Sequence, residues 1–260
     1  MRISLASFAG LLAAALCATS WAATPPVESK SASAPAPIGM FEAMKAGQVE
    51  VQYIPIDESR QAKLLFKNKT KEPLSLKLPA NFGAAPILAQ GGLGGLGGIG
   101  GGQQGGQQGQ NQQAGGGIGG QQGGGQQGGG AGLFNIAPEK VGELVVATVC
   151  LEHGKLEPSK YVAYEVKPLS ECTTKPGVAE ALALLADGKT NQKVAQAAVW
   201  HLANGLTWDQ LAAKKVNRVG RADTAYYEVN ELQAAMELTK HVEKLAKANA
   251  KAITTTGSSE

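Results

Sequence analysis

The stretch LVVATVCL, residues 144–151, decides the fold of this chain. Its apolar and β-branched side chains predict a strand, and Cys150 places a thiol near the end of that strand. Alternating apolar residues predict further strands at 49–53, 64–66, 74–78 and 161–166, with turn-forming residues between them. Roughly five or six short strands punctuated by turns are typical of a β-sandwich.

The pattern changes to helical spacing in the last third of the chain. Pro176 suits the first turn of a helix, and Thr190 is expected to cap a second one. Thr207 begins a capping-box pattern for a short third helix, and Asn230 begins another for a long final helix. We therefore expect an α+β fold, with an N-terminal β-sandwich subdomain followed by a C-terminal α-helical subdomain.

The first 22 residues have the pattern of a secretory signal peptide. Arg2 precedes an apolar run at 5–16, and Ser20-Trp21-Ala22 offers the small-x-small pattern that signal peptidase recognises. The mature chain is thus expected to be exported, to a periplasm, a cell surface or the extracellular space. No second long apolar run follows, so no stable membrane insertion is expected after cleavage.

Residues 91–132 are built mainly from glycine and glutamine. They hold 24 of the 35 glycines and no charged residue, a composition that predicts a long disordered Gly/Gln-rich insertion. The expected organisation is a signal peptide (1–22), a flexible leader (23–37), the first part of the β-sandwich (38–90), the insertion (91–132), the second part of the β-sandwich (133–171), the helical subdomain (172–252) and a disordered tail (253–260).

Several functional classes find no support in the sequence. The formal net charge is only +3, and no Lys/Arg cluster is interleaved with aromatic residues, so no nucleic-acid partner is expected. Matches to G-x-G-x-x-G fall only within the glycine-rich block, where they arise by chance, and no cofactor is predicted. The three histidines have no metal-ligand spacing, and common hydrolase motifs are absent, so neither a metal site nor an enzyme is predicted.

One polar side chain interrupts the apolar stretch VAQAAVW, residues 194–200. A lone amide in such surroundings needs a partner, or it bears a desolvation cost of roughly 1–3 kcal/mol. If the Cys150 thiol met the Gln196 carboxamide in a dry pocket, the two could condense into an internal thioester. Cys172 offers Cys150 a competing disulfide, which is common in exported proteins.

The residues around Cys150 and Gln196 resemble the two signature segments of bacterial surface thioester domains. The first is Val149-Cys150-Leu151-Glu152, and the second is Ala195-Gln196 followed by Trp200, with Ala195 where the family usually has threonine. The resemblance covers about 60 residues. It implies a β-sandwich combined with a helical subdomain, and covalent attachment to a surface or matrix protein or to a polysaccharide.

The sequence therefore predicts an exported, non-enzymatic binding or structural protein of the cell envelope or extracellular space. In its most specific form it is a thioester-type adhesion module, with Cys150 and Gln196 as the reacting pair and Glu152, His153 and Trp200 lining the site. One alternative is a passive envelope protein stapled by a Cys150–Cys172 disulfide. Another is an enzyme of unrecognised class that uses Cys150 and His153.

Overall fold

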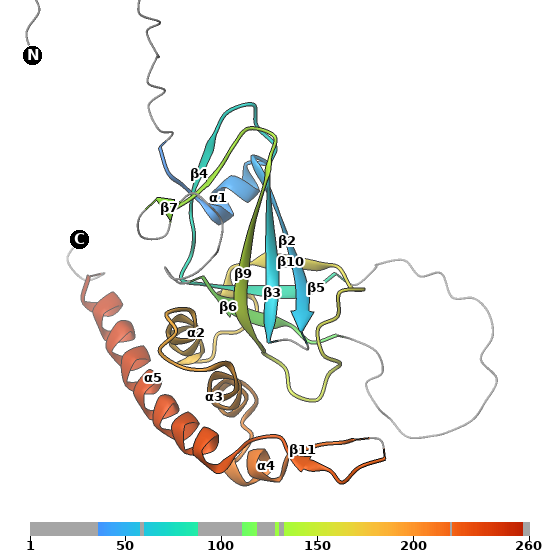
Figure 1. Cartoon of the computed structure of the whole chain (residues 1–260). Coiled ribbons are helices and arrows are strands. Elements are labelled where there is room, and N and C mark those ends of the chain that lie inside the picture. The colour runs from blue at the N-terminus through green and yellow to red at the C-terminus, as the bar shows by residue number, and fades with distance from the viewer. Residues whose placement is uncertain are drawn as a thin grey trace, which may run out of the picture. The chain divides into compact units, whose positions relative to one another are not determined.

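The computed structural model describes residues 36–57, 60–87, 111–118, 128–129, 133–218 and 220–256. The predicted signal peptide and nearly all of the predicted leader lie outside these residues. The expected α+β class is confirmed, with the β-strands gathered mainly in the first part of the chain and the helices in the last (Figure 1).

The elements follow one another in the order β1 (Ile38–Gly39), α1 (Met40–Lys45), β2 (Val49–Asp57), β3 (Gln61–Asn68), β4 (Leu74–Lys77), β5 (Asn81–Pro86), β6 (Ala114–Gly117), β7 (Gly128–Gly129), β8 (Leu133–Ile136), β9 (Val141–Cys150), β10 (Tyr164–Lys167), the 3₁₀ turn η1 (Leu169–Glu171), α2 (Val178–Ala186), α3 (Gln192–Asn204), α4 (Trp208–Ala213), β11 (Lys215–Val216), β12 (Thr224–Ala225) and α5 (Val229–Thr256).

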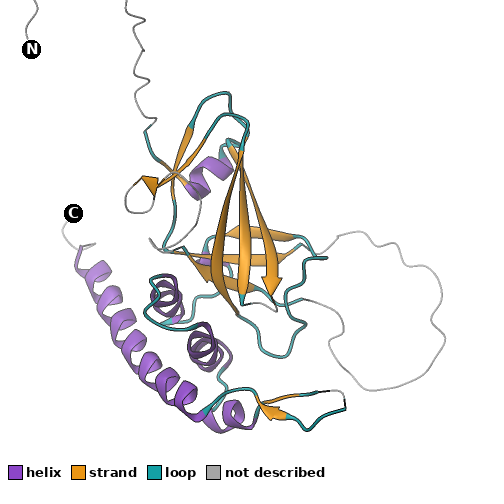
Figure 2. Cartoon of the chain, viewed as in Figure 1, coloured by secondary structure: helices purple, strands orange, loops and turns teal. Residues whose placement is uncertain are grey.

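The long strand β9 joins two halves of one sheet. Within the described residues this sheet has six strands in the order β10-β5-β6-β9-β3-β2. Residues 141–147 of β9 pair with β3, whereas residues 148–150 pair with β6. Strands β2, β3 and β9 run across β5, β6 and β10 in Figure 2, and the outer strands β2 and β10 contact each other. The strands thus form one folded sheet, and the sandwich stays a prediction.

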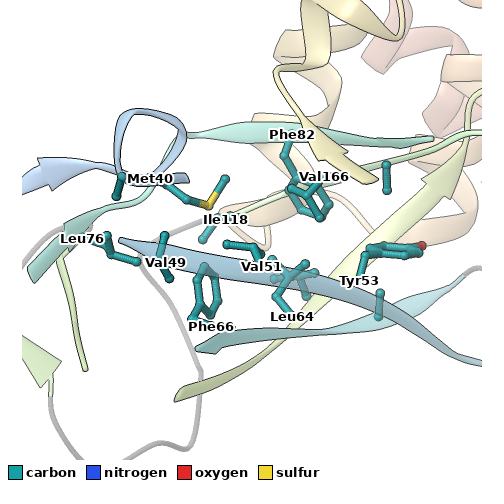
Figure 3. Packing of buried hydrophobic residues seen from close by; sticks show 14 of the residues in the cluster. Met40, Val49, Val51, Tyr53, Leu64, Phe66, Leu76, Phe82, Ile118 and Val166 are labelled. Carbon is teal, nitrogen blue, oxygen red and sulfur yellow. The ribbon is translucent and has the colours of Figure 1, made fainter. Parts of the chain in front are cut away.

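The largest hydrophobic core lies between the two halves of this sheet (Figure 3). Alternation along β3 buries Ala62, Leu64 and Phe66 completely, as the period of two in a strand requires. Phe82 of β5 and Tyr53 of β2 meet with their ring centroids 6.2 Å apart. A smaller sheet, β1-β4-β8-β7, lies at one end of this core.

The prediction that residues 91–132 form one disordered insertion is wrong for residues 111–118 and 128–129. Strand β6 lies in the middle of the sheet between β5 and β9, and all four of its residues are buried. A Cβ on Gly116 would lie 2.6 Å from the Phe82 ring, and one on Gly117 would lie 2.3 Å from the backbone oxygen of Leu182. Glycine is therefore required here, because helix α2 and the core approach the strand too closely for any side chain.

The helices cover the sheet where β6 and β9 meet. Helices α2 and α3 contact β9, α2 also contacts β6, and α5 packs across α2 and α3 (Figure 1). The predicted capping box of Thr207 and Gln210 is confirmed, and Gly205 ends α3 with a positive φ of 70°. No helix in the described part of the chain is long and apolar enough to cross a bilayer.

Four predicted boundaries are wrong. The strand predicted at 161–166 begins only at Tyr164 and continues to Lys167, because Tyr161 is an exposed turn residue. Asn191, and not Thr190, caps α3, because its side chain accepts a hydrogen bond from the Val194 N–H. Asn230 lies inside α5, which begins at Val229; there the Glu231 carboxylate accepts the N–H of Glu228, 2.8 Å away. The same helix continues to residue 256, so the predicted tail of residues 253–260 begins too early, and its last four residues lie outside the described ranges.

We expect Gly117→Ala to destabilise the fold by about 1–3 kcal/mol, because overpacking a closed contact costs that much. The added methyl group would meet the Leu182 oxygen and, at 2.4 Å, the Ala186 side chain. Gly39→Ala is the matched control, since Gly39 has a φ of −60° and its nearest neighbour is the flexible end of Glu42, 3.1 Å away. Urea unfolding measures both variants; equal stabilities would contradict the proposed contact between β6 and α2.

Candidate functional site

Cys150 is the last residue of β9 and lies just beyond the end of its partner strand β3. The final ladder pair between the two strands is Ala147 with Gln61, and the Thr148 N–H still donates to the Arg60 oxygen at 2.9 Å. Backbone groups two residues apart point to the same side of a strand. Cys150 therefore presents its N–H and C=O on this same side, where β3 no longer supplies a partner.

The side chain of Gln196 takes the place of the missing strand. Its Oε1 accepts the Cys150 N–H at 2.8 Å, and its Nε2 donates to the Cys150 oxygen, also at 2.8 Å. Cys150 is 3% exposed and Gln196 is 2% exposed. The amide that sequence analysis found to need a partner thus pairs with the backbone of the predicted cysteine, out of contact with water.

A second glutamine of α3, Gln192, also bonds to the backbone of β9, two residues before Cys150. Gln192 donates from its Nε2 to the Thr148 oxygen at 3.2 Å. Four residues along a helix rise about 6 Å, and two residues along a strand rise about 6.7 Å. Gln192 and Gln196 therefore match Thr148 and Cys150 in spacing, which fixes the position of α3 along β9. Gln192 was not predicted as a site residue, although the i, i+4 spacing of the two glutamines is visible in the sequence.

The surroundings of the Gln196 carboxamide are suited to reactions at its carbonyl carbon. The Cys150 N–H lies against Oε1, the atom on which negative charge would develop during an attack on that carbon. A backbone N–H placed in this way stabilises an oxyanion, and the effect is strongest where water is excluded. The site thus combines a thiol-bearing residue, an amide and an oxyanion donor.

Glu152 has a supporting role beside this pair. Its Oε2 accepts the Gln113 N–H at 2.9 Å, and its Oε1 pairs with Lys155 at 2.5 Å. Gln113 directly precedes β6, and its backbone oxygen accepts the Leu151 N–H at 2.9 Å. The acidic residue predicted to line the site therefore holds the start of β6 against the end of β9.

His153 and Trp200 form an outer layer with Lys214, which sequence analysis did not identify. The His153 and Trp200 rings meet edge-on with centroids 4.9 Å apart. The Lys214 Nζ lies 4.9 Å from the Trp200 centroid, within cation–π range, and 3.3 Å from Nε2 of His153. Partial burial is the main cause that lowers the pKa of His153, and the charge of Lys214 lowers it further.

Two tyrosines that precede α5 complete the aromatic cluster. Tyr226 and Tyr227 meet in a T-shape with centroids 4.7 Å apart, and each also contacts the Trp200 ring. Tyr227 lies in the same buried cluster as Cys150 and Trp200. Neither the Tyr227 hydroxyl nor the Trp200 indole N–H has a hydrogen-bond partner within the described residues.

The structure does not join Cys150 to Cys172. Cys150 belongs to the cluster with Trp200 and Tyr227, whereas Cys172 packs against a different cluster, next to Gly83 of β5. Burial raises the pKa of the Cys172 thiol to about 11. No group of three or more His, Cys, Asp or Glu side chains suited to a metal ion occurs among the described residues.

Replacing Gln196 with leucine should destabilise the protein by at least about 2 kcal/mol, because it leaves two buried backbone groups of Cys150 without partners. Both this variant and the control Gln192→Leu are made in a Cys150→Ala background, so that no covalent bond contributes. The control removes one longer hydrogen bond at the edge of the site and should cost less. Denaturant unfolding compares the two, and equal losses would contradict the central place of Gln196.

The imidazole of His153 should titrate below the usual pKa of a solvent-exposed histidine. The unfolded chain, in which His153 has its usual pKa, then binds a proton at a higher pH than the folded chain does. The free energy of unfolding therefore decreases as the pH falls from the usual pKa of histidine through the lowered pKa of His153. Lys214→Met should raise the pKa of His153 only partway, since burial is the larger cause. Titration of the His153 ring signals by NMR measures both values, and an unchanged pKa in the variant would exclude the influence of Lys214.

Comparison with known proteins finds no matching family model, no similar curated protein and no similar solved structure.

Proposed function

We propose that the protein is an exported, non-enzymatic adhesion module that forms an internal thioester between Cys150 and Gln196. The observation that carries this proposal is the pair of 2.8 Å hydrogen bonds between the Gln196 carboxamide and the Cys150 backbone. They hold the amide against the residue that bears the thiol, on rigid elements that are distant in sequence. Such positioning is what an otherwise very slow condensation needs.

In the proposed reaction the sulfur of Cys150 attacks the Cδ atom of Gln196. A C–S bond forms and the C–N bond breaks; the thiol proton passes to the departing nitrogen, which leaves as ammonia. The Cys150 N–H faces the carbonyl oxygen during this step and stabilises its developing charge. The near-complete burial of both residues excludes the water that would hydrolyse the product.

The thioester would then be used once, by an amine or hydroxyl of a surface or matrix protein or of a polysaccharide. The nucleophile bonds to Cδ, the C–S bond breaks, and the thiol of Cys150 is restored. Gln196 stays bound to the partner, so there is no turnover and the protein is not an enzyme. A partner would enter on the side of His153, which is the most exposed member of the outer layer.

Two finer features belong to the same proposal. We interpret the folded six-stranded sheet as the β-sandwich of a thioester domain, and α2 to α5 as its helical subdomain. Export is supported by the sequence of the first 22 residues, which lie outside the described ranges.

Intact mass spectrometry of the mature, non-reduced protein tests the proposal. We expect a mass lower by one ammonia than the sequence requires, and addition of one methylamine on incubation with that amine. Cys150→Ala should abolish both effects, whereas Cys172→Ser should leave them unchanged. A mass lower by two hydrogens that reduction restores would instead establish the Cys150–Cys172 disulfide. A full, unmodified mass that methylamine does not change would exclude the thioester.

A further inference from the structure

Three tyrosines from separate parts of the chain interact electrostatically with Cys150. They are Tyr53 of β2, Tyr164 of β10 and Tyr227, just before α5. Burial raises the pKa of each phenol, and a charge on Cys150 raises all three further. The three hydroxyls are therefore within electrostatic reach of the sulfur, and each remains a protonated hydrogen-bond donor at neutral pH.

Tyr227 differs from the other two in the cluster to which it belongs. It lies in the same buried cluster as Cys150, whereas Tyr53 and Tyr164 belong to the core between the two halves of the sheet. The Tyr164 hydroxyl accepts the Ser159 N–H at 3.3 Å, and the Tyr53 hydroxyl, like that of Tyr227, has no hydrogen-bond partner among the described residues. The Tyr227 hydroxyl is buried without any partner among the described residues, on a side chain that is only 3% exposed. An unpartnered buried hydroxyl costs about 1–3 kcal/mol, so this group is free to donate to an acceptor that forms within its cluster.

The packing of Tyr227 holds its ring within the buried cluster that contains Cys150. Tyr227 and Cys150 belong to one buried cluster, together with Ala197 and Ala198, the two residues that follow Gln196. Edge-on contacts to Tyr226 at 4.7 Å and to Trp200 at 6.4 Å restrict its ring. The donor is thus fixed before any partner binds.

We propose that the Tyr227 hydroxyl donates a hydrogen bond to the sulfur of Cys150 when a nucleophile opens the thioester. This inference rests on the proposed function. The nucleophile's lone pair forms the new bond to Cδ of Gln196, and the electrons of the C–S bond pass to sulfur. The proton lost by the nucleophile ends on that sulfur, and Tyr227 keeps its own. The hydroxyl stabilises the sulfur while it carries negative charge, which an apolar cluster would otherwise disfavour.

Tyr227→Phe removes the one oxygen atom and tests the inference. Methylamine incorporation, followed by intact mass against time, should slow about 10- to 100-fold, since one hydrogen bond to a charged group is worth roughly that factor. The melting temperature should stay the same or rise, because the lost hydroxyl has no hydrogen-bond partner among the described residues. Tyr164→Phe is the matched control, and its rate should stay close to that of the wild type.

The outcomes separate this inference from the proposed function. A wild-type protein that never loses ammonia overturns both. A Tyr227→Phe variant that forms the thioester and reacts with methylamine at the wild-type rate overturns the role of Tyr227 alone. A slower reaction accompanied by a lower melting temperature, with Tyr164→Phe equally slow, would show a general packing effect and would also overturn that role.

Discussion

The pairing of the Gln196 carboxamide with the backbone of Cys150 is the constraint on which the site depends. Strand β9 extends past the end of its partner β3. The Gln196 side chain of α3 supplies the hydrogen bonds that β3 no longer provides. This pairing fixes the position of α3 along the strand. It thereby places Trp200, one turn further along α3, against His153, and it places the following alanines against Tyr227. The sheet and the helical layer are thus joined at the same residues that would carry the chemistry.

Much of the local structure could be predicted because its causes are local. The apolar run that ends at Cys150, the capping box at Thr207 and the glycine that ends α3 each follow from neighbouring residues. The need of Gln196 for a partner also followed from its apolar neighbours. Which partner it found did not, since contacts between a strand and a helix depend on the packing of the whole chain.

Strand β6 could not be predicted for a different reason. Glycine has low strand propensity, so Ala114–Gly117 carries no local signal for a strand. Its conformation is imposed by neighbours, namely the Phe82 ring on one side and the backbone of α2 on the other. Lys214 was missed for a related reason. Its importance lies in the side chains it contacts, and those lie far away in the sequence.

The glycine strand also has a consequence for the kinetics of folding. A strand built mainly from glycine specifies its register weakly, and the Gln-Gln pair that precedes β6 recurs several times between residues 103 and 127. Only one alignment places Ala114 opposite Cys150 and buries Ile118 in the core. Folding is therefore expected to select one of several similar segments of the chain, with mispaired registers as competing traps. The pairing of β6 with β5 and β9 completes the middle of the sheet and the site at Cys150. This pairing is thus expected to be the slow step of folding.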